Sequence, residues 1–389
     1  MEIAKKQNNR GLEASILNNL GGIYNEFSQY VKALELHQLA LEIDIENNNL
    51  AGKASSLNNI GCVYRSLGQY SKALEHYNKA LKIFRELGDR ANEATVLNNF
   101  GGIYDQQGQY CEALEYYCQA LSILREIGAR EGEGITLNNI GAVYSFLGEF
   151  PKALQYYKES LSLHQEIGDF AIQGMTLNNI AHIYCRCGHY AAALESYEEA
   201  LVIASKVGAR DTEATILSNI GLLYASLGEF EKALNYYELA LALRRDINAV
   251  PGQGETLYLI GDVYRNLANY SKAQDYLQEA LAIHREIGDI MSEGNTLSIL
   301  GLIYRDLKEY EKALENYQQA LMIRKKLGNR MDELENLEYI GEVFLELEQH
   351  SEALEYYQQA LVVAREMDYQ HSEDRIIETI NEINSRSFA

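Results

Sequence analysis

The strongest constraint on the fold is an internal period of forty residues. When the sequence is written in rows of forty residues, one column holds glycine in eight of nine rows and Ala181 in the remaining row. An aromatic residue follows three positions later in every row. A sequence with such a period folds as a stack of similar repeats, so chain length says little about the number of domains. The glycine column consists of Gly21, Gly61, Gly101, Gly141, Gly221, Gly261, Gly301 and Gly341.

Each repeat is predicted to form two helices, because its apolar residues fall at helical spacing in two runs. Gly148 predicts the turn between the helices, and the pair Gly168-Asp169 predicts the end of one helix and the start of the next. One such hairpin carries apolar residues on more than one face, so it must stack against its neighbours to bury them. In the fourth repeat the two runs are Leu137, Ile140, Gly141 and Tyr144, then Phe150, Ala153, Leu154, Tyr157 and Leu161.

The composition agrees with an all-α fold. Hydrophobic residues make up 47% of the 389 residues, and the chain has only 2 prolines. A proline inside a helix costs about 3 kcal/mol, so both prolines should lie at helix boundaries. We expect Pro151 in the first turn of a second helix and Pro251 in a loop between repeats.

Charge and cysteine usage limit the environment and the partners. The formal net charge of -22 argues against a nucleic-acid partner, because such a surface cannot neutralise phosphates. No secretory leader opens the sequence, and no apolar run of about 18 residues would span a membrane. The five scattered cysteines are typical of a reducing compartment. The sequence therefore predicts a cytoplasmic protein without nucleic-acid or membrane partners.

The repeat resembles the tetratricopeptide repeat (TPR), whose pattern is tryptophan, leucine, glycine, tyrosine, alanine and phenylalanine. Leu137, Ile140, Gly141, Tyr144 and the later Ala153-to-Tyr157 segment match it, with leucine in place of tryptophan. Each repeat is longer than the usual 34 residues and lacks the closing proline. This long form is similar to the repeats of kinesin light chain, Pins-type polarity scaffolds and bacterial regulatory proteins. The resemblance implies a right-handed superhelical solenoid of about nine hairpins whose concave groove binds peptides.

The sequence predicts three segments within this solenoid. Residues 1-10 align with the end of a second helix, which suggests a truncated preceding repeat, and residues 11-367 hold nine tandem repeats in one solenoid domain. Residues 368-389 are predicted to form a C-terminal capping helix and tail, with Ile376 to Ile383 as its apolar face.

Paired asparagines in the first helices are the best candidates for a binding site. Asparagine forms helices poorly, yet the pair recurs at one place in five successive repeats and is reduced to Ser218-Asn219 in the sixth. At about 100° per residue, both side chains of a pair point away from the partner helix. The resemblance places this face in the peptide groove. The predicted residues are Asn18, Asn19, Asn58, Asn59, Asn98, Asn99, Asn138, Asn139, Asn178, Asn179 and Asn219.

Two interpretations of the pairs remain open. An asparagine amide can hydrogen-bond the N-H and C=O of an extended peptide whatever its sequence. Alternatively, it can bond the backbone of the adjacent repeat. We assign Asn139 and its equivalents to the stacking role, and Asn138 and its equivalents to ligand contact. The residue three positions after each pair, on the same helix face, is small in the first four repeats. A small residue there would leave room for the backbone of a peptide. These small residues are Gly22, Cys62, Gly102 and Ala142.

Charges on the same helices suggest selectivity. Four arginines near the ends of first helices could pair with acidic side chains or a C-terminal carboxylate of a peptide. The C-terminal third is acidic on this face, which would suit a basic segment of the partner. Solvated surface charge is the alternative for each residue. The arginines are Arg65, Arg186, Arg265 and Arg305, and the acids are Glu255, Asp262, Glu335, Glu338, Glu342 and Glu346.

Catalytic and metal-binding signatures are missing from the sequence. No phosphate-binding glycine loop, HExxH or GxSxG motif occurs. His182, Cys185, Cys187 and His189 are close in sequence, but they span a turn set by the repeat, and no other repeat has the cluster. We therefore expect neither an enzyme nor a bound metal or cofactor.

Two functions follow from this reading. The first is a scaffold or adaptor that binds an extended peptide in its groove through the asparagines. The second is a regulatory or self-associating region of a larger signalling protein, in which the repeats pack against another copy or an effector domain such as a protease or NTPase.

Overall fold

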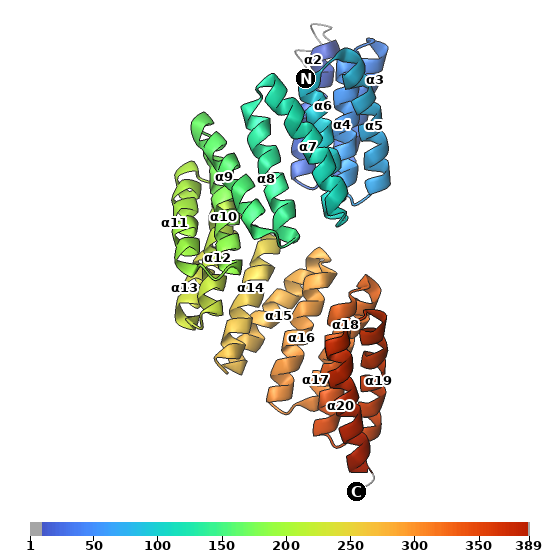
Figure 1. Ribbon diagram of the computed structural model, residues 1–389, viewed down its shortest axis with the longest axis vertical. Coiled ribbons are helices and arrows are strands. Elements are labelled where there is room, and N and C mark those ends of the chain that lie inside the picture. Colours follow the sequence, from blue (N-terminus) through green and yellow to red (C-terminus); the bar gives the residue numbers. More distant parts are fainter. Residues whose placement is uncertain (1–9, 388–389) are drawn as a thin grey trace. The chain divides into compact units, whose positions relative to one another are not determined.

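The computed structural model describes residues 10–387, which contain nineteen α-helices (Figure 1). The predicted repeat 1–10 lies almost wholly outside these residues. The first helices of the nine repeats are α2 (Arg10–Glu26), α4 (Leu50–Ser66), α6 (Arg90–Gln106), α8 (Arg130–Phe146), α10 (Phe170–Arg186), α12 (Arg210–Ser226), α14 (Val250–Asn266), α16 (Ile290–Asp306) and α18 (Arg330–Glu346). The second helices are α3 (Tyr30–Glu46), α5 (Tyr70–Leu87), α7 (Tyr110–Ile127), α9 (Phe150–Ile167), α11 (Tyr190–Val207), α13 (Phe230–Asp246), α15 (Tyr270–Ile287), α17 (Tyr310–Leu327) and α19 (His350–Glu366). Helix α20 (Gln370–Ser387) follows them.

A residue with positive φ ends the helices at regular intervals of twenty residues. In the fourth repeat, Gly148 (φ 74°) forms the turn inside the hairpin and Gly168 (φ 72°) forms the turn to the next repeat. Asp169 then caps α10 by accepting a hydrogen bond from the backbone N-H of Ile172 at 3.2 Å. Glycine adopts this left-handed conformation without steric cost, which explains its recurrence at both turns.

Close contact between a glycine and an aromatic ring joins the two helices in most hairpins; the exceptions are Ala181 in the fifth repeat and Leu277, which packs on Gly261, in the seventh. Gly101 on α6 lies against the ring of Tyr117 on α7, and a Cβ atom at residue 101 would come within 2.6 Å of that ring. Tyr117 is 3% exposed, and its equivalents Tyr77 and Tyr237 are buried as well. The small residue on one helix therefore makes the space that the large residue on the other fills.

The predicted core of the fourth repeat is confirmed. Leu137, Ile140 and Ala153 are fully buried, and Tyr157 is buried against Gly141. Tyr144 is half-buried and stacks on Tyr156 with a centroid separation of 5.5 Å. The same stacked pair recurs between first and second helices in several other repeats.

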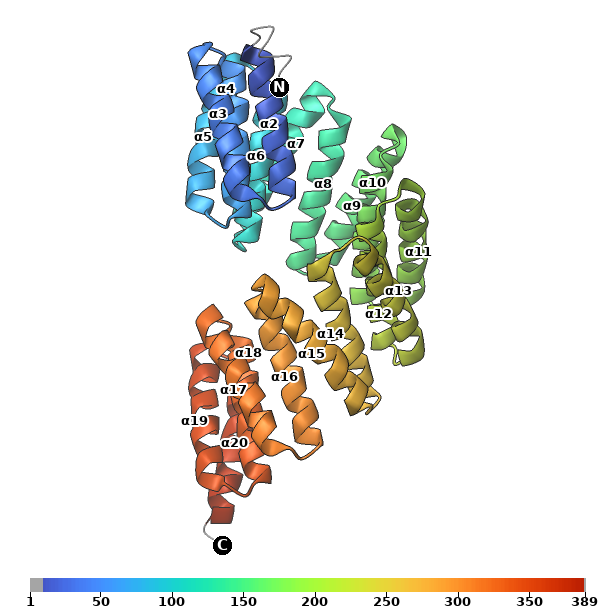
Figure 2. The ribbon, with the colours of Figure 1, turned by 180° about the vertical axis from the view of Figure 1, so that it is seen from behind.

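Within each of two parts of the chain, the helix pairs stack in sequence order, and first helices of neighbouring repeats also touch, as α2 and α4 do (Figure 2). The chain divides into two compact parts, one ending at Val207 and the other starting at Gly208. We call them the N-terminal part, repeats one to five, and the C-terminal part, repeats six to nine with α20. Helix α20 packs on α19 through the buried Ile376 and Ile383, which confirms the predicted capping helix.

The two prolines lie at helix starts. Pro151 is in the first turn of α9, as expected. Pro251 is also in a first turn, that of α14, and not in the loop where the sequence analysis put it. The loop before α14 is only three residues long, so residue 251 already belongs to the helix, where the missing N-H of proline is harmless.

Replacing Gly101 by alanine should destabilise the fold by about 1–2 kcal/mol, because the Cβ atom would overlap the buried Tyr117 ring. The gain in helix propensity, at most about 1 kcal/mol, offsets only part of that cost. Ala181 at the equivalent place in the fifth repeat shows that the helices can adjust to a methyl group, so the chain should still fold. Thermal unfolding followed by circular dichroism would measure the loss.

Gly22 is the matched control for this substitution, since a Cβ atom there would meet nothing within 4 Å. Gly22→Ala should therefore leave the melting temperature unchanged or raise it slightly. Equal effects of the two substitutions would contradict the packing argument.

Lowering the pH should destabilise the first hairpin through His37, which replaces the usual tyrosine and packs against Gly21. Burial lowers the pKa of His37 from 6.5 to about 4. The unfolded chain therefore takes up a proton before the folded chain does. Stability that is fully present above pH 6.5 should fall by about 2 kcal/mol between pH 6.5 and pH 5. Hydrogen exchange of the α2 and α3 amides at both pH values measures this loss.

His37→Tyr introduces the residue found at seven of the other eight repeats and is the control. In this variant, the part of the pH dependence of α2 and α3 amide protection that His37 causes should disappear. A variant that keeps the full pH dependence in α2 and α3 would show that another group is responsible.

Candidate functional site

The asparagine pairs lie along the first helices of the N-terminal part. They belong to α2, α4, α6, α8 and α10, which contact one another in order. All are half-buried except Asn19, which is exposed. Their side chains are therefore partly enclosed by neighbouring repeats and partly open to solvent.

Hydrogen bonds between asparagines connect successive repeats. Asn99 Nδ2 donates to Asn58 Oδ1 at 2.9 Å, across a separation of 41 residues. The same bond recurs at 3.3 Å from Asn139 to Asn98. It recurs again, also at 3.3 Å, from Asn179 to Asn138. In the third, fourth and fifth repeats, the second asparagine of the pair thus reaches back to the first asparagine of the preceding repeat.

The first asparagine accepts a further bond from the next repeat. Thr136 Oγ1 donates to Asn98 Oδ1 and Thr176 Oγ1 donates to Asn138 Oδ1, each at 3.3 Å. The stacking role predicted from the sequence falls on the second asparagine alone, with a backbone partner. In the structure both asparagines take part, and the partner is a side chain.

These bonds use only part of the amide capacity. Each link uses the Oδ1 of one asparagine and the Nδ2 of another. The Nδ2 of Asn98 and Asn138 and the Oδ1 of Asn99 and Asn139 make no other hydrogen bond within residues 10–387. A half-buried amide can use these donors and acceptors for a ligand without breaking the link between repeats.

The two ends of the row differ from its middle. Asn18 donates to Ser56 Oγ at 2.9 Å and lies 2.8 Å from His37 Nδ1, so it joins α2 to α4 and to α3. Asn178 and Asn219 also interact with other residues. In the C-terminal part, Ser298 donates to Asn336 at 3.0 Å, which makes the equivalent link without an asparagine pair.

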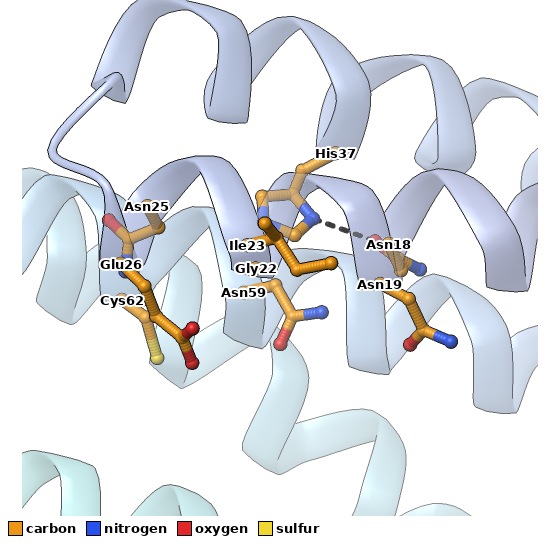
Figure 3. A pocket seen from close by; sticks show the side chains of 9 residues that line it. All are labelled: Asn18, Asn19, Gly22, Ile23, Asn25, Glu26, His37, Asn59 and Cys62. Carbon is orange, nitrogen blue, oxygen red and sulfur yellow. Dashed lines mark hydrogen bonds between the residues drawn. The ribbon is translucent and has the colours of Figure 1, made fainter.

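A pocket of about 360 Å³ lies where α2 and α4 meet (Figure 3). Three of the predicted asparagines, Asn18, Asn19 and Asn59, line it together with the small residues Gly22 and Cys62. Space above Gly22 is open, since a Cβ atom there would touch nothing within 4 Å. The remaining lining residues are Ile23, Asn25, Glu26 and His37.

Polar groups gather around Gly102, another of the small residues. Arg65 on α4 extends over it, with Nη1 2.9 Å from the place of a Cβ atom, and the Tyr117 hydroxyl is 3.7 Å from that place. Asp105 follows one turn later on α6, and its buried Oδ1 has no hydrogen-bond partner among the described residues. Burial raises the pKa of Asp105. Neither Tyr117 nor Asp105 was predicted as a site residue. The available signal was that Asp105 is the single aspartate at its position in the nine repeats.

The four predicted arginines fall into two groups. Arg265 pairs with Asp262 at 2.8 Å, and Arg305 pairs with Glu342. No carboxylate in residues 10–387 forms an ion pair with Arg65 or Arg186. Arg186 is exposed and lies 5.7 Å from the ring centroid of Phe150, whereas Arg65 is half-buried. Only Arg65 thus combines partial burial with an unpaired guanidinium group.

The predicted acidic residues are partly neutralised within the C-terminal part. Glu338 accepts two hydrogen bonds from Arg375 of the capping helix, at 2.9 and 2.8 Å. Burial raises the pKa of Glu338 and Glu342 despite these arginines. Glu335 accepts a hydrogen bond from the Tyr339 hydroxyl at 2.7 Å.

Across residues 10–387, no helix has the length and apolar character needed to cross a bilayer. In the same range, no group of three or more histidine, cysteine or acidic side chains is arranged to hold a metal ion.

Comparisons with solved structures show proteins of the same fold. The apo form of the quorum sensor NprR from B. thuringiensis is 19% identical, with a TM-score of 0.60 over 88% of this chain and 98% of that one. A Rap protein complexed with competence and sporulation factor is 17% identical, with a TM-score of 0.58 over 92% and 99%. A STAND signal transduction ATPase with a tetratricopeptide repeat sensor, from Pyrococcus horikoshii, is 14% identical, with a TM-score of 0.60 over 88% and 55%. No curated protein matches the sequence.

Family models of the tetratricopeptide repeat match most of the sequence. One model matches residues 12–86, 67–126, 92–166, 173–246 and 292–366, and a second matches residues 254–286. Together with the nine helix hairpins of residues 10–387, these matches show that the chain belongs to the tetratricopeptide repeat family.

Proposed function

We propose that this protein is a non-catalytic scaffold that binds an extended peptide along the asparagine row of its N-terminal part. The observation that carries the proposal is the set of amide groups that the links between repeats leave unused. A peptide backbone offers alternating N-H and C=O groups, and the unused Nδ2 and Oδ1 atoms can bond both. Each bond adds only about 0.5–1.5 kcal/mol, so useful affinity needs several bonds in register.

Room for a peptide supports the same location. Glycine, cysteine, glycine and alanine stand beside the asparagine pairs in the first four repeats, and the space above Gly22 is open. Larger residues replace them in the later repeats, from His182 onward. The small residues and the complete asparagine pairs therefore occur together in repeats one to four.

Arg65 and Asp105 supply selectivity at the centre of this row. The unpaired guanidinium group of Arg65 suits a carboxylate of the peptide, either an acidic side chain or the C-terminus. The unpaired Oδ1 of Asp105 suits a donor from the same segment. The more acidic C-terminal part, with Glu335 and Glu346, would take a basic segment of the partner. Arg186, Arg265 and Arg305 remain candidates for side-chain contacts along the ligand.

The known structures of this fold are consistent with a peptide-binding role. NprR is a quorum sensor, and the Rap structure holds competence and sporulation factor. At 17–19% identity these likenesses concern the fold, and the ligand of this chain follows from its own residues. The strongly negative surface favours a protein or peptide partner over nucleic acid.

A regulatory or self-associating region of a larger protein is the second candidate function. The STAND protein carries its tetratricopeptide repeats as a sensor, and this chain covers 55% of its length. Size-exclusion chromatography with light scattering separates the two functions, because a scaffold that binds foreign peptides should elute as a monomer. A dimer whose association is abolished by changes in the asparagine row would favour the second function.

Replacing Asn58, Asn98 and Asn138 together by aspartate should abolish peptide capture and leave the fold intact. Each aspartate keeps an oxygen that accepts the bond from the next repeat, but it loses the Nδ2 donor. Peptides would be selected from a random display library on the wild-type protein. We expect at least tenfold weaker binding of those peptides, with a melting temperature within a few degrees of the wild type.

Asn78→Asp, Gln119→Glu and Asn235→Asp together form the matched control. These three exposed amides lie on second helices, so the control adds the same negative charge away from the row. It should bind like the wild type. Unchanged capture by the Asn58, Asn98 and Asn138 variant, or equal loss in both variants, would exclude the asparagine row as the binding site.

A further inference from the structure

An unusual pocket of about 470 Å³ lies between the second helices α3 and α5, over the N-terminal half of α4. It shares no lining residue with the pocket between α2 and α4, and none of the asparagines of the row lines it. Its volume falls within the range of about 300–1,000 Å³ that small-molecule sites occupy. Its lining residues are Leu41, Ile45, Leu50, Lys53, Leu57, Lys79, Lys82, Ile83 and Glu86.

The next junction along the chain shows what the repeat normally places here. There Arg85 Nε pairs with Glu93 at 2.8 Å, and Arg90 pairs with Glu93 at 2.6 Å and with Glu126 at 2.9 Å. These ion pairs connect α5, α6 and α7. The following junction repeats the arrangement with Arg125, Arg130, Glu133, Glu159 and Glu166.

At the pocket, only Glu86, the equivalent of Glu126, is kept from this network, and the other positions carry different residues. Ile45 stands where the next repeat has Arg85, and Leu50 stands where it has Arg90. Lys53 replaces Glu93, which reverses the charge at the centre of the network. Lys79 stands where the third junction has Glu159. These substitutions remove the ion pairs and leave Ile45 and Leu50 exposed beside basic residues.

The exposure of the apolar residues fits a site rather than a packed core. Ile45 is 52% exposed and Leu50 is 49% exposed, whereas Leu57 at the floor is buried. Large aliphatic side chains at this exposure keep apolar surface in contact with water, and a ligand that covered this surface would gain the free energy of burying it.

The charges at the rim select an anion. Lys53 is half-buried and has no carboxylate partner among the described residues, and Lys82 is exposed with none. Lys79 pairs with Glu75 at 2.6 Å on its own helix. Glu86 is the single acid in the lining. Three lysines around one glutamate give a local positive potential in a chain whose net charge is -22.

We infer that this pocket binds an amphiphilic carboxylate, with its apolar body against Ile45, Leu50 and Leu57 and its carboxylate at Lys53. Lys82 lies on the opposite helix and provides a second cation for the same group. Lys53 in a partly apolar setting forms a stronger ion pair than a fully solvated lysine does, since water screens it less. Such a ligand would bind independently of the peptide in the asparagine row.

The triple substitution Ile45→Arg, Leu50→Arg and Lys53→Glu tests this inference, since it rebuilds the network of the next junction. It adds two positive charges and exchanges one positive for one negative, so the net charge of the protein does not change. Because it copies an arrangement that the same fold already contains, the variant should melt no lower than the wild type. A second variant, Lys82→Ser, introduces serine, which the next repeat has at the equivalent position, Ser122. It removes only one cation of the rim.

Isothermal titration calorimetry with decanoate, below its micelle concentration, measures binding to the full chain. We expect saturable binding at one site in the wild type, at least tenfold weaker binding in the triple variant and a smaller loss in Lys82→Ser. Decyltrimethylammonium, with the same chain and the opposite charge, should bind at least tenfold more weakly than decanoate. The peptides selected on the asparagine row should bind the triple variant as they bind the wild type.

Three results would overturn the inference. One is a wild-type protein that does not bind decanoate. Another is equal affinity for decanoate and decyltrimethylammonium, which would show that the lysines do not select the anion. The third is a triple variant that keeps decanoate binding but loses self-association in light scattering, which would identify this surface as a contact between copies of the chain.

Discussion

The contact between a glycine on one helix and a buried ring on the next is the constraint on which the structure depends. In most repeats the first helix has no side chain at this point, and the ring of the second helix fills the space beside it. Gly61 with Tyr77 and Gly301 with Tyr317 repeat the arrangement in both parts of the chain. Once the hairpin geometry is fixed in this way, the positions that touch the next repeat are fixed too. The contacts between repeats can therefore vary in chemistry without changing the fold.

Most of the fold could be predicted because nine copies of one pattern reinforce each other. A single glycine or tyrosine indicates little, but the same column in each row identifies the buried face of both helices. Pro251 was placed wrongly because a boundary shift of one or two residues moves a proline from loop to helix. The turn positions, such as Ala268 and Lys308 with positive φ, follow from the regular spacing and not from residue type. There the neighbouring helices hold residues other than glycine in a conformation that they rarely adopt alone.

The site was harder to predict than the fold, because its contacts join residues that are far apart in sequence. The helical wheel correctly indicates which face Asn98 and Asn139 share, but it cannot show that their amides meet across 41 residues. That meeting depends on the rotation between repeats, which periodicity does not supply. The same limit applies to the pocket near Lys53. Its unusual residues are visible in the aligned rows, but only the structure shows that Ile45, Leu50 and Lys53 converge with Lys79 and Lys82.

The repeats also provide an internal comparison that separates structural need from other roles. If the asparagine pair served stacking alone, the C-terminal part would need it as well. It does not, because Ser298 and Asn336 make an equivalent link there with one hydroxyl and one amide. Two adjacent asparagines per repeat therefore exceed what the stack requires, and they carry a cost in helix propensity of roughly 0.5–0.7 kcal/mol each. In the N-terminal part, that cost was kept through five successive copies. This excess hydrogen-bonding capacity, together with the unpaired Arg65 in the same row, is the reason for proposing a peptide partner at this face.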